Sequence, residues 1–337
     1  MIRLSICIAT LNRAAFIGAT LDTILPQLTE AVEVVIVDGA STDGTDTVVA
    51  AHFAGRSNCR FHRLAEKGGV DRDYCRAVTA AQGDFCWLMT DDDLLKPGAV
   101  TTILEQLREE PDLLVVNAEV ANQDLSANLI PKKMSLERNR DFGVGEQAGL
   151  LALAGDMLSF IGAVVIRRSL WESREREAYF GTEFIHVGVI FQKPLDRFAR
   201  VLAEPLLRIR YGNAQWTSRA FEIWMFKWPG LIWSFAHLPE EAKAAVCRRE
   251  PWKDATPLLM MKARGCFTYR DYRSRLSARP MRWWTRMKVA AIAAFPDALF
   301  NCLLTFSAPV FFPRAKGLRL ELRQSPFDYR KRWFGDG

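Results

Sequence analysis

The first 117 residues alternate short apolar runs with segments of helical periodicity. Residues 4–8, 32–37 and 85–89 are mostly apolar, and between them apolar side chains recur at helical spacing, as over residues 14–25. Strands that bury both of their faces are typical of a parallel sheet that helices cover on both sides. The alternation therefore predicts an α/β fold with a Rossmann-like, mostly parallel sheet flanked by helices.

Polar side chains follow three of these runs, at the point where each strand is expected to end. They are, in chain order, Thr10, Asn12, Arg13, Asp38, Asp91, Asp92 and Asp93. Ligands of parallel α/β sheets bind outside the carboxyl ends of the strands, so we expect these side chains to meet at one edge. Adjacent carboxylates repel one another unless a cation neutralises them, and their oxygens suit Mg²⁺ or Mn²⁺ shared with substrate phosphates. The pattern predicts a phosphate-binding metal site.

Simpler structural roles for the same residues stay open from the local pattern alone. The acidic triplet could form a solvated turn in which Asp93 caps a helix that begins near Gly98. Asp38 could close a polar turn, and Asn12 could cap the helix expected at residues 14–25. Dinucleotide-binding and P-loop folds are disfavoured, because no G-x-G-x-x-G follows the first strand and no Walker A sequence is present.

An acid and a histidine interrupt the apolar segment at residues 179–188, which follows a strand expected at residues 160–166. Glu183 and His186 are three positions apart and would share one face of a helix. A buried carboxylate is costly unless it is paired or takes part in chemistry, whereas a lone histidine in apolar surroundings is more often structural. Glu183 is therefore the stronger candidate for chemistry, and His186 is the alternative.

The C-terminal third differs from the rest of the chain in charge and aromatic content. Residues 262–337 contain 16 Lys or Arg against 5 Asp or Glu, and eight of the ten tryptophans lie at or after Trp216. Prolines and polar residues interrupt the apolar stretch at 289–312, whereas a spanning helix needs ~20 apolar residues. We expect a helical, amphipathic extension over residues 213–337 that lies on an anionic membrane surface. A helical cap on the catalytic domain or an oligomer interface is the alternative, and the oligomeric state stays open.

Cysteine usage and the N-terminus bear on where the protein works. The seven cysteines include no C-x-x-C pair, which argues against a zinc site or a disulfide framework and favours a reducing cytoplasm. The chain enters its first strand at Leu4 without the apolar region of a signal peptide. Nucleic acid is not an expected partner, because no recognised binding module is present and the apolar content is high. These features predict a peripheral protein on the cytoplasmic side of a membrane.

Three motifs together resemble family 2 glycosyltransferases with the GT-A fold. They are Ile8-Ala9-Thr10-Leu11-Asn12-Arg13, Val35-Ile36-Val37-Asp38-Gly39-Ala40-Ser41-Thr42-Asp43-Gly44-Thr45 and Leu88-Met89-Thr90-Asp91-Asp92-Asp93. Their order and spacing make the resemblance specific, and it covers about residues 1–120. Residues 160–166 and 181–188 are similar to abequosyltransferase-like members, which build lipid-linked O-antigen units.

The resemblance implies a role for each part of the chain. A GT-A catalytic domain would span residues 1–212, with a nucleotide-sugar half at 1–117 and an acceptor half at 118–212. The donor-binding residues that the resemblance implies are Thr10, Asn12, Arg13, Asp38, Asp71 and Asp91. Asp92 and Asp93 would be the ligands of Mn²⁺ or Mg²⁺.

The register of the D-x-D motif stays open, because three acids are adjacent. Thr90 occupies the place of the first acid if Asp92 is the metal ligand, whereas Asp91 and Asp93 would otherwise form the pair. Glu183 stands where the family places its general base, often within a Glu-Asp pair, but an aromatic residue follows it here. The resemblance therefore implies Glu183 as the base, with His186 as the alternative.

The resulting expectation is an inverting, metal-dependent glycosyltransferase that moves a sugar from a nucleotide-sugar donor to a hydroxyl of a polyprenyl-diphosphate-linked glycan. Such an enzyme would serve the synthesis of a cell-surface polysaccharide of O-antigen type, at the cytoplasmic face of the inner membrane. Two alternatives stay open. One is direct transfer to a polyprenyl phosphate, and the other is a non-catalytic protein that binds nucleotide-sugars as an assembly scaffold.

Overall fold

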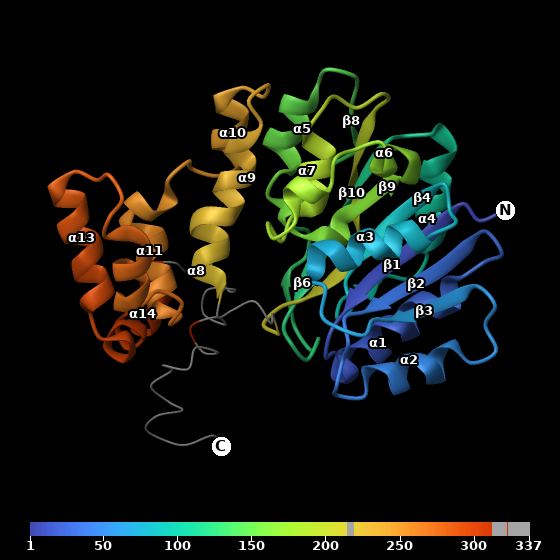
Figure 1. Ribbon diagram of the computed structural model, residues 1–337, viewed down its shortest axis with the longest axis horizontal. Coiled ribbons are helices and arrows are strands. Elements are labelled where there is room, and N and C mark those ends of the chain that lie inside the picture. The colour runs from blue at the N-terminus through green and yellow to red at the C-terminus, as the bar shows by residue number, and fades with distance from the viewer. Residues whose placement is uncertain (214–218, 312–321, 323–337) are drawn as a thin grey trace. The chain divides into compact units, whose positions relative to one another are not determined.

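The computed structural model describes most of the chain (Figure 1). The described residues are 1–213, 219–311 and 322. Trp216 and residues 312–321 and 323–337 of the predicted extension lie outside them.

The chain divides into two compact units. The first joins Met1–Arg210 with Ser234–Val246, and the second joins Tyr211–Trp233 with Cys247–Gly337. The main segment of the first unit ends close to the boundary expected at residue 212. The single expected boundary does not account for Ser234–Val246, which belongs to the first unit although it follows residue 212.

Four parallel strands form the N-terminal half of the sheet. The elements of this half are β1 (Leu4–Thr10), α1 (Ala14–Ile24), β2 (Val32–Asp38), α2 (Thr45–Phe53), β3 (Cys59–Arg63), α3 (Val70–Ala80) and β4 (Phe85–Met89). The strands lie in the order β3-β2-β1-β4, and all three pairings are parallel. β2 and β4 are buried along their whole length, as their apolar runs predict. The α/β fold expected from the alternation is confirmed.

The direction of chain progress across the sheet reverses at β1. β2 and β3 are added on one side of β1, and β4 is added on the other. α1 packs against α2, α3 packs against β1 and β2, and Figure 1 shows α3 on the opposite face of the sheet. Ligands of open α/β sheets bind at such a switch, outside the carboxyl ends of the strands. Thr10 pairs with Asp38, and Ile8 pairs with Met89, so the polar residues after β1, β2 and β4 emerge side by side.

The second half of the sheet mixes parallel and antiparallel pairs. Its strands are β5 (Leu94–Leu95), β6 (Leu113–Ala121), β7 (Asn128–Ile130), β8 (Arg140–Phe142), β9 (Val164–Arg167) and β10 (Ala199–Arg210). Its helices are α4 (Ala99–Gln106), α5 (Gln147–Ala154), α6 (Arg168–Glu172), α7 (Ile185–Phe191) and α10 (Glu240–Val246). β9 lies antiparallel between β4 and β6, and β10 runs parallel to β6. The sheet is thus continuous across both halves.

The strand expected at residues 160–166 is shorter than predicted. A 3₁₀ turn covers Ile161–Ala163, and β9 begins at Val164. The indole N–H of Trp87 donates a hydrogen bond to the carbonyl oxygen of Gly162 at 2.9 Å. A side chain of β4 therefore satisfies this stretch of backbone, in place of a strand ladder.

The second unit is helical, and its core contains aromatic side chains. Its helices include α8 (Ala220–Glu222), α9 (Trp228–Ser234), α11 (Ala255–Ala263), α12 (Tyr269–Asp271), α13 (Trp283–Ala294) and α14 (Asp297–Phe311). Phe221 stacks on Phe267, with ring centroids 4.6 Å apart, in a core that also buries Trp252. Some aromatic residues that were expected at a membrane surface therefore serve the core of this unit. α13 ends and α14 begins on either side of Pro296, where the apolar stretch was expected to break.

No helix of the described chain is by itself long and apolar enough to cross a membrane. α13 and residues Asp297–Ser307 of α14 meet the required length and composition together, but a bend of 95° separates them.

Candidate active site

Arg13 and two of the acids after β4 form ion pairs at the carboxyl edge of the sheet. Arg13 Nε lies 3.3 Å from Asp91 Oδ1, and a terminal nitrogen of the same guanidinium lies 3.4 Å from Asp92 Oδ2. These three side chains are only 12–13% exposed, so water screens their charges weakly. The structure thus brings together residues from the ends of β1 and β4, as the sequence predicts.

Two acids of this cluster have raised pKa values. Burial, and then the charge of Asp92, raise the pKa of Asp91 to about 7, although Arg13 and the Thr10 hydroxyl oppose the rise. Burial and the charge of Asp92 also raise the pKa of Asp93 well above its usual value. A cation bound beside these carboxylates would favour their ionised forms.

Asp93 has a structural role at this edge. Its Oδ2 accepts a hydrogen bond from the Thr90 hydroxyl at 2.5 Å, and its Oδ1 accepts one from the backbone N–H of Arg210 at 2.6 Å. Asp93 does not cap α4, which has no side-chain cap, so that simpler interpretation of the triplet is wrong. With both oxygens of Asp93 engaged, the contacts favour Asp91 and Asp92 as ligands of a cation.

Arg210 is a residue of this site that the sequence analysis missed. Its Nε donates to the backbone oxygen of Asp92 at 3.0 Å. Its guanidinium lies 5.4 Å from the centre of the Phe16 ring, which Arg13 also contacts, at 5.6 Å. The available signal was the pair Arg208 and Arg210, two cations at strand spacing near the end of the catalytic domain.

Asp38 is fully buried at the end of β2, and its two oxygens have different surroundings. Oδ1 accepts hydrogen bonds from the backbone N–H and the hydroxyl of Ser41, at 3.1 and 2.5 Å. Oδ2 accepts no hydrogen bond from the described residues, and Arg63 Nε lies 3.8 Å from it. A buried acceptor without a donor costs about 1–3 kcal/mol, so this oxygen suits a donor group of a bound ligand. Asp38 therefore closes the turn with one oxygen, and its other oxygen accepts no hydrogen bond from the described residues.

Thr10 and Asn12 shape the chain after β1. Thr10 is buried as the last residue of the strand. Asn12 has a φ of +54°, its side-chain oxygen accepts the N–H of Thr42, and its own N–H donates to the Ser41 hydroxyl. Asn12 does not cap α1, because Asp43 accepts the N–H of the first residue of that helix, at 3.0 Å. Donor contacts by Thr10 and Asn12 stay predictions.

Glu183 lies just before α7 in an uncommon backbone conformation. Its φ is +72°, in the left-handed region that residues other than glycine and asparagine rarely adopt. α7 begins at Ile185, so Glu183 and His186 do not share a helix face, and that expectation is wrong. Asp71, which was expected at the donor, is buried and accepts the backbone N–H of Glu183 at 3.0 Å. A donor contact by Asp71 stays a prediction.

His186 is completely buried. Its Nε2 lies 2.7 Å from the carbonyl oxygen of Leu158, which can only accept, so this nitrogen carries the proton. Burial lowers the pKa of His186 to about 4, against the opposing effect of the carbonyl. The imidazole is therefore neutral at neutral pH and is not accessible to solvent. These properties favour Glu183 over His186 as the base.

The residues at the carboxyl edge fit a divalent cation that is shared with a phosphate ligand. Asp91 and Asp92 offer carboxylate oxygens, the ligands that Mg²⁺ and Mn²⁺ prefer. Among the described residues, no three His, Cys, Asp or Glu side chains are arranged to hold a metal ion by themselves. One or two carboxylates are sufficient where substrate phosphates and water complete the coordination.

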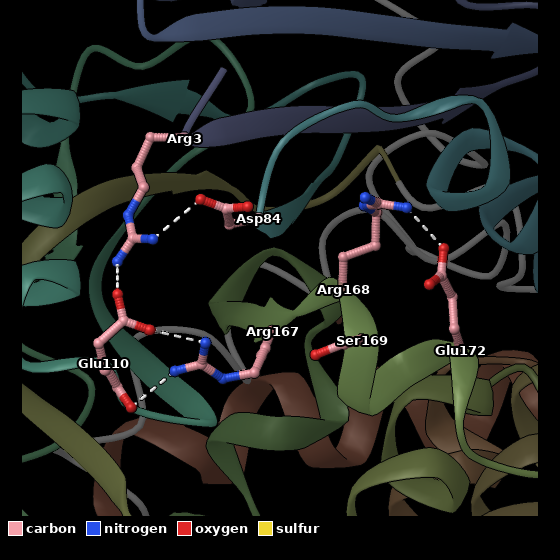
Figure 2. Close-up of a pocket in the computed structure, with 7 residues that line it drawn as sticks. All are labelled: Arg3, Asp84, Glu110, Arg167, Arg168, Ser169 and Glu172. Atoms are coloured by element: carbon pink, nitrogen blue, oxygen red, sulfur yellow. Dashed lines mark hydrogen bonds and ion pairs between the residues drawn. The ribbon is translucent and has the colours of Figure 1, made fainter. Parts of the chain in front are cut away.

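A second charged region, a cavity of about 240 Å³, lies at the opposite, amino edge of the sheet (Figure 2). Its lining residues are Arg3, Asp84, Glu110, Arg167, Arg168, Ser169 and Glu172. Figure 2 shows that its arginines and acids pair with one another. The nitrogen–oxygen distance is 2.9 Å between Arg3 and Asp84 and 2.7 Å between Arg167 and Glu110. Because these charges neutralise each other, this cavity gives no reason to place chemistry at the amino edge.

Comparison with known proteins defines the class to which this site belongs. Residues 5–172 match the model of glycosyl transferase family 2, and this span contains the motifs after β1, β2 and β4. The chain belongs to the family 2 glycosyltransferases, has the GT-A fold, and is an enzyme.

Particular relatives sharpen this assignment. An abequosyltransferase of Salmonella typhimurium is 25% identical over 228 residues, which cover 62% of this chain and 67% of the relative. The GalNAc(5)-diNAcBac-PP-undecaprenol β-1,3-glucosyltransferase of Campylobacter jejuni is 24% identical over 54% of this chain. The latter match spans 58% of the glucosyltransferase, which is less than two thirds of its length.

A solved structure shares the fold. The mannosyltransferase PcManGT from Pyrobaculum calidifontis, in complex with GDP-Man and Mn²⁺, superposes with a TM-score of 0.56. The match covers 99% of this chain and 88% of that chain at 16% identity, so it supports the fold and not the substrate.

Proposed function

We propose that this enzyme transfers a sugar, with inversion, from a nucleotide-sugar donor to a hydroxyl of a polyprenyl-diphosphate-linked glycan. The observation that carries the proposal is the meeting of Arg13, Asp91 and Asp92 at the switch point of the sheet. At the end of the adjacent strand β2, one oxygen of Asp38 accepts no hydrogen bond from the described residues. A diphosphate carries the negative charge that an arginine and a divalent cation offset. The acceptor named for the Campylobacter relative supports a lipid-linked glycan, and the mannosyltransferase complex supports a nucleotide-sugar with Mn²⁺.

The carboxyl edge would act on the leaving group. Mn²⁺ or Mg²⁺ held by Asp91 and Asp92 would stabilise the charge that develops on the diphosphate. Arg13, which lies between the two carboxylates, would hold the diphosphate against them. Asp38 would orient the nucleotide by accepting a hydrogen bond from its base or ribose with Oδ2.

Glu183 would act on the acceptor. Its carboxylate would take the proton of the attacking hydroxyl as that oxygen forms a bond to the anomeric carbon. The bond between the anomeric carbon and the diphosphate oxygen breaks in the same step, and the nucleoside diphosphate leaves from the opposite face. A single displacement inverts the anomeric configuration without a covalent enzyme intermediate.

The variant Glu183→Gln tests the assignment of the base. We expect turnover to fall by about 10²–10⁴-fold, because an amide cannot accept the proton, while donor affinity stays within about twofold. Donor affinity is measured by calorimetry, and turnover as transfer to a synthetic polyprenyl-diphosphate-linked acceptor. A thermal-shift screen of UDP-, GDP-, CDP- and dTDP-sugars with Mn²⁺ selects the donor. His186→Gln is the matched variant and should retain turnover. Near-normal turnover of Glu183→Gln, or an inactive but folded His186→Gln, reverses the assignment.

We also propose that the second unit holds the enzyme on anionic lipid, as a peripheral protein at the cytoplasmic face of the inner membrane. Large apolar side chains of α13 and α14 that are half exposed or more include Trp283, Trp284, Met287, Leu299 and Leu303. Residues 272–296 contain six Lys or Arg and no acid. Exposed apolar side chains with basic neighbours suit an interface of acyl chains and anionic headgroups.

Sedimentation with vesicles of anionic and of neutral lipid tests this surface. We expect the protein to bind anionic vesicles, and about 0.5 M salt to weaken binding by screening. The combined variant Trp283→Ala/Trp284→Ala/Leu303→Ser should bind at least about tenfold more weakly, because it removes apolar area that the lipid would bury. Val144→Ser, at a side chain that is 65% exposed in the first unit, is the control and should bind normally. Unchanged binding of the combined variant contradicts the proposal.

A further inference from the structure

The carboxylate of Asp71 is directed at a segment more than a hundred positions away in the sequence. Asp71 lies in the first turn of α3 and is 4% exposed. Its Oδ2 accepts the backbone N–H groups of Gly181 and Glu183, at 2.7 and 3.0 Å, and its Oδ1 accepts that of Ile185, at 3.2 Å. Hydrogen bonds to an ionised group are stronger than those between neutral groups. One side chain therefore holds the backbone of a single turn at every second residue from Gly181 to Ile185.

This turn needs external support. Gly181 and Glu183 both have positive φ, +85° and +72°, and the latter value is strained for a residue with a side chain. Strained backbone persists where its surroundings hold it in place. Arg72, the neighbour of Asp71, adds a cation–π contact with Phe180 at 5.1 Å. The start of α3 thus fixes the backbone from which the Glu183 side chain projects.

α3 also connects the same turn to the acidic cluster. The Tyr74 hydroxyl, one helical turn beyond Asp71, donates to the backbone oxygen of Met89 at the end of β4, at 2.9 Å. Burial, and then the charges of the three acids that follow β4, raise the pKa of Tyr74. Residues three apart on a helix are neighbours on its surface. Two adjacent side chains of α3 therefore contact the turn of Glu183 and the strand that leads to Asp91.

We propose that Asp71 is a positioning residue for the transfer reaction, whose carboxylate fixes the turn that aims Glu183 at the acceptor hydroxyl. This role differs from the donor contact that was expected for Asp71, which stays a prediction. The inference rests on the proposed function of Glu183 as the base. It adds that the base depends on a residue of the nucleotide-sugar half of the domain.

The experiment compares Asp71→Asn with Asp112→Asn. Asp112 is also buried and accepts a backbone N–H from a distant residue, that of Arg197 at 2.7 Å, but it precedes β6 at the amino edge. We expect Asp71→Asn to lower kcat by about 10–100-fold with donor affinity unchanged, because a displaced base loses its near-attack geometry. Asp112→Asn should lower the melting temperature and keep kcat.

Two further measurements separate positioning from a general loss of structure. Hydrogen exchange should accelerate at residues 180–186 in Asp71→Asn and near residue 197 in Asp112→Asn, whether or not the variant is active. The double variant Asp71→Asn/Glu183→Gln should be no slower than Glu183→Gln alone, because Asp71 acts through Glu183.

The outcomes distinguish this inference from the proposed function. An inactive Glu183→Gln together with wild-type kcat in Asp71→Asn overturns the positioning role and leaves the base in place. Multiplied losses in the double variant, or a parallel loss of donor affinity, also overturn it, because Asp71 would then act elsewhere. An active Glu183→Gln removes the proposed base, and the positioning role with it.

Discussion

The two edges of the central sheet carry clusters of the same residue types in opposite electrostatic states. At the amino edge, Glu110 ion-pairs with both Arg167 and Arg3, and these contacts lower the pKa of Glu110. At the carboxyl edge, Arg13 contacts Asp91 and Asp92, yet the pKa of Asp91 rises to about 7. Partners lower the pKa of an acid at one edge, whereas burial and a neighbouring acid raise it at the other.

The difference separates charge that stabilises the fold from charge that is available to a ligand. Paired groups at the amino edge satisfy each other, whereas buried carboxylates with raised pKa values make the folded state less stable at neutral pH. Such groups are typical of functional sites, where a substrate or cation completes them. The cavity of about 240 Å³ lies at the amino edge, so empty volume and raised carboxylate pKa values indicate opposite edges of the sheet.

Between the two edges, the larger expected effect comes from removing a carboxylate at the carboxyl edge. Asp92→Asn should lower kcat/KM by about 10²–10³-fold, because a ligand of the cation and a partner of Arg13 is lost. The concentration of Mn²⁺ needed for half-maximal activity should rise. Stability should not fall, since the change relieves repulsion among the acids. An unchanged dependence on Mn²⁺ excludes Asp92 as a ligand.

At the amino edge we expect a smaller effect, a loss of stability without a loss of activity. Glu110→Gln leaves Arg3 and Arg167 without their shared partner, and the half-exposed position limits the loss to about 1 kcal/mol. The melting temperature should fall by about 2–4 °C, while kcat/KM stays within about twofold of wild type. Thermal unfolding and the transfer assay measure the two quantities. Loss of activity at an unchanged melting temperature would place function at the amino edge and remove the contrast.

The features that sequence predicts best are those at the strand ends. Thr10, Asp38 and Asp91 follow apolar runs, and parallel pairing around β1 brings such positions to one edge whatever the loops do. The α/β class of the N-terminal half follows from the same pattern. The antiparallel insertion of β9 between β4 and β6 does not, because contacts far apart in the chain decide the pairing of a four-residue strand.

The features that escaped prediction depend on distant segments. Arg210 reaches Asp93 from 117 positions away, and Asp71 holds Glu183 from 112 positions away, with no local pattern to mark either contact. Propensity also argues against a left-handed glutamate, so the turn before α7 could not be foreseen. The placement of His186 on one helix face with Glu183 failed for that reason.

An effect similar in size to that of Glu110→Gln is a pH-dependent difference in stability at the carboxyl edge. Burial, and then the charge of Asp92, raise the folded-state pKa of Asp91 from 3.8 to about 7. The folded protein therefore binds this proton more tightly than the unfolded chain, so stability decreases as pH rises between these two values. Asp91→Asn removes this titration.

The melting temperature of Asp91→Asn relative to wild type should therefore increase by about 2–4 °C from about pH 5.5 to about pH 8. Asp124→Asn is the control, because Asp124 is exposed and its hydrogen bonds with Ser126 lower its pKa, so it is ionised throughout this range. Its difference from wild type should be independent of pH. If Asp91→Asn behaves like this control, Asp91 titrates normally and the electrostatic contrast between the two edges disappears.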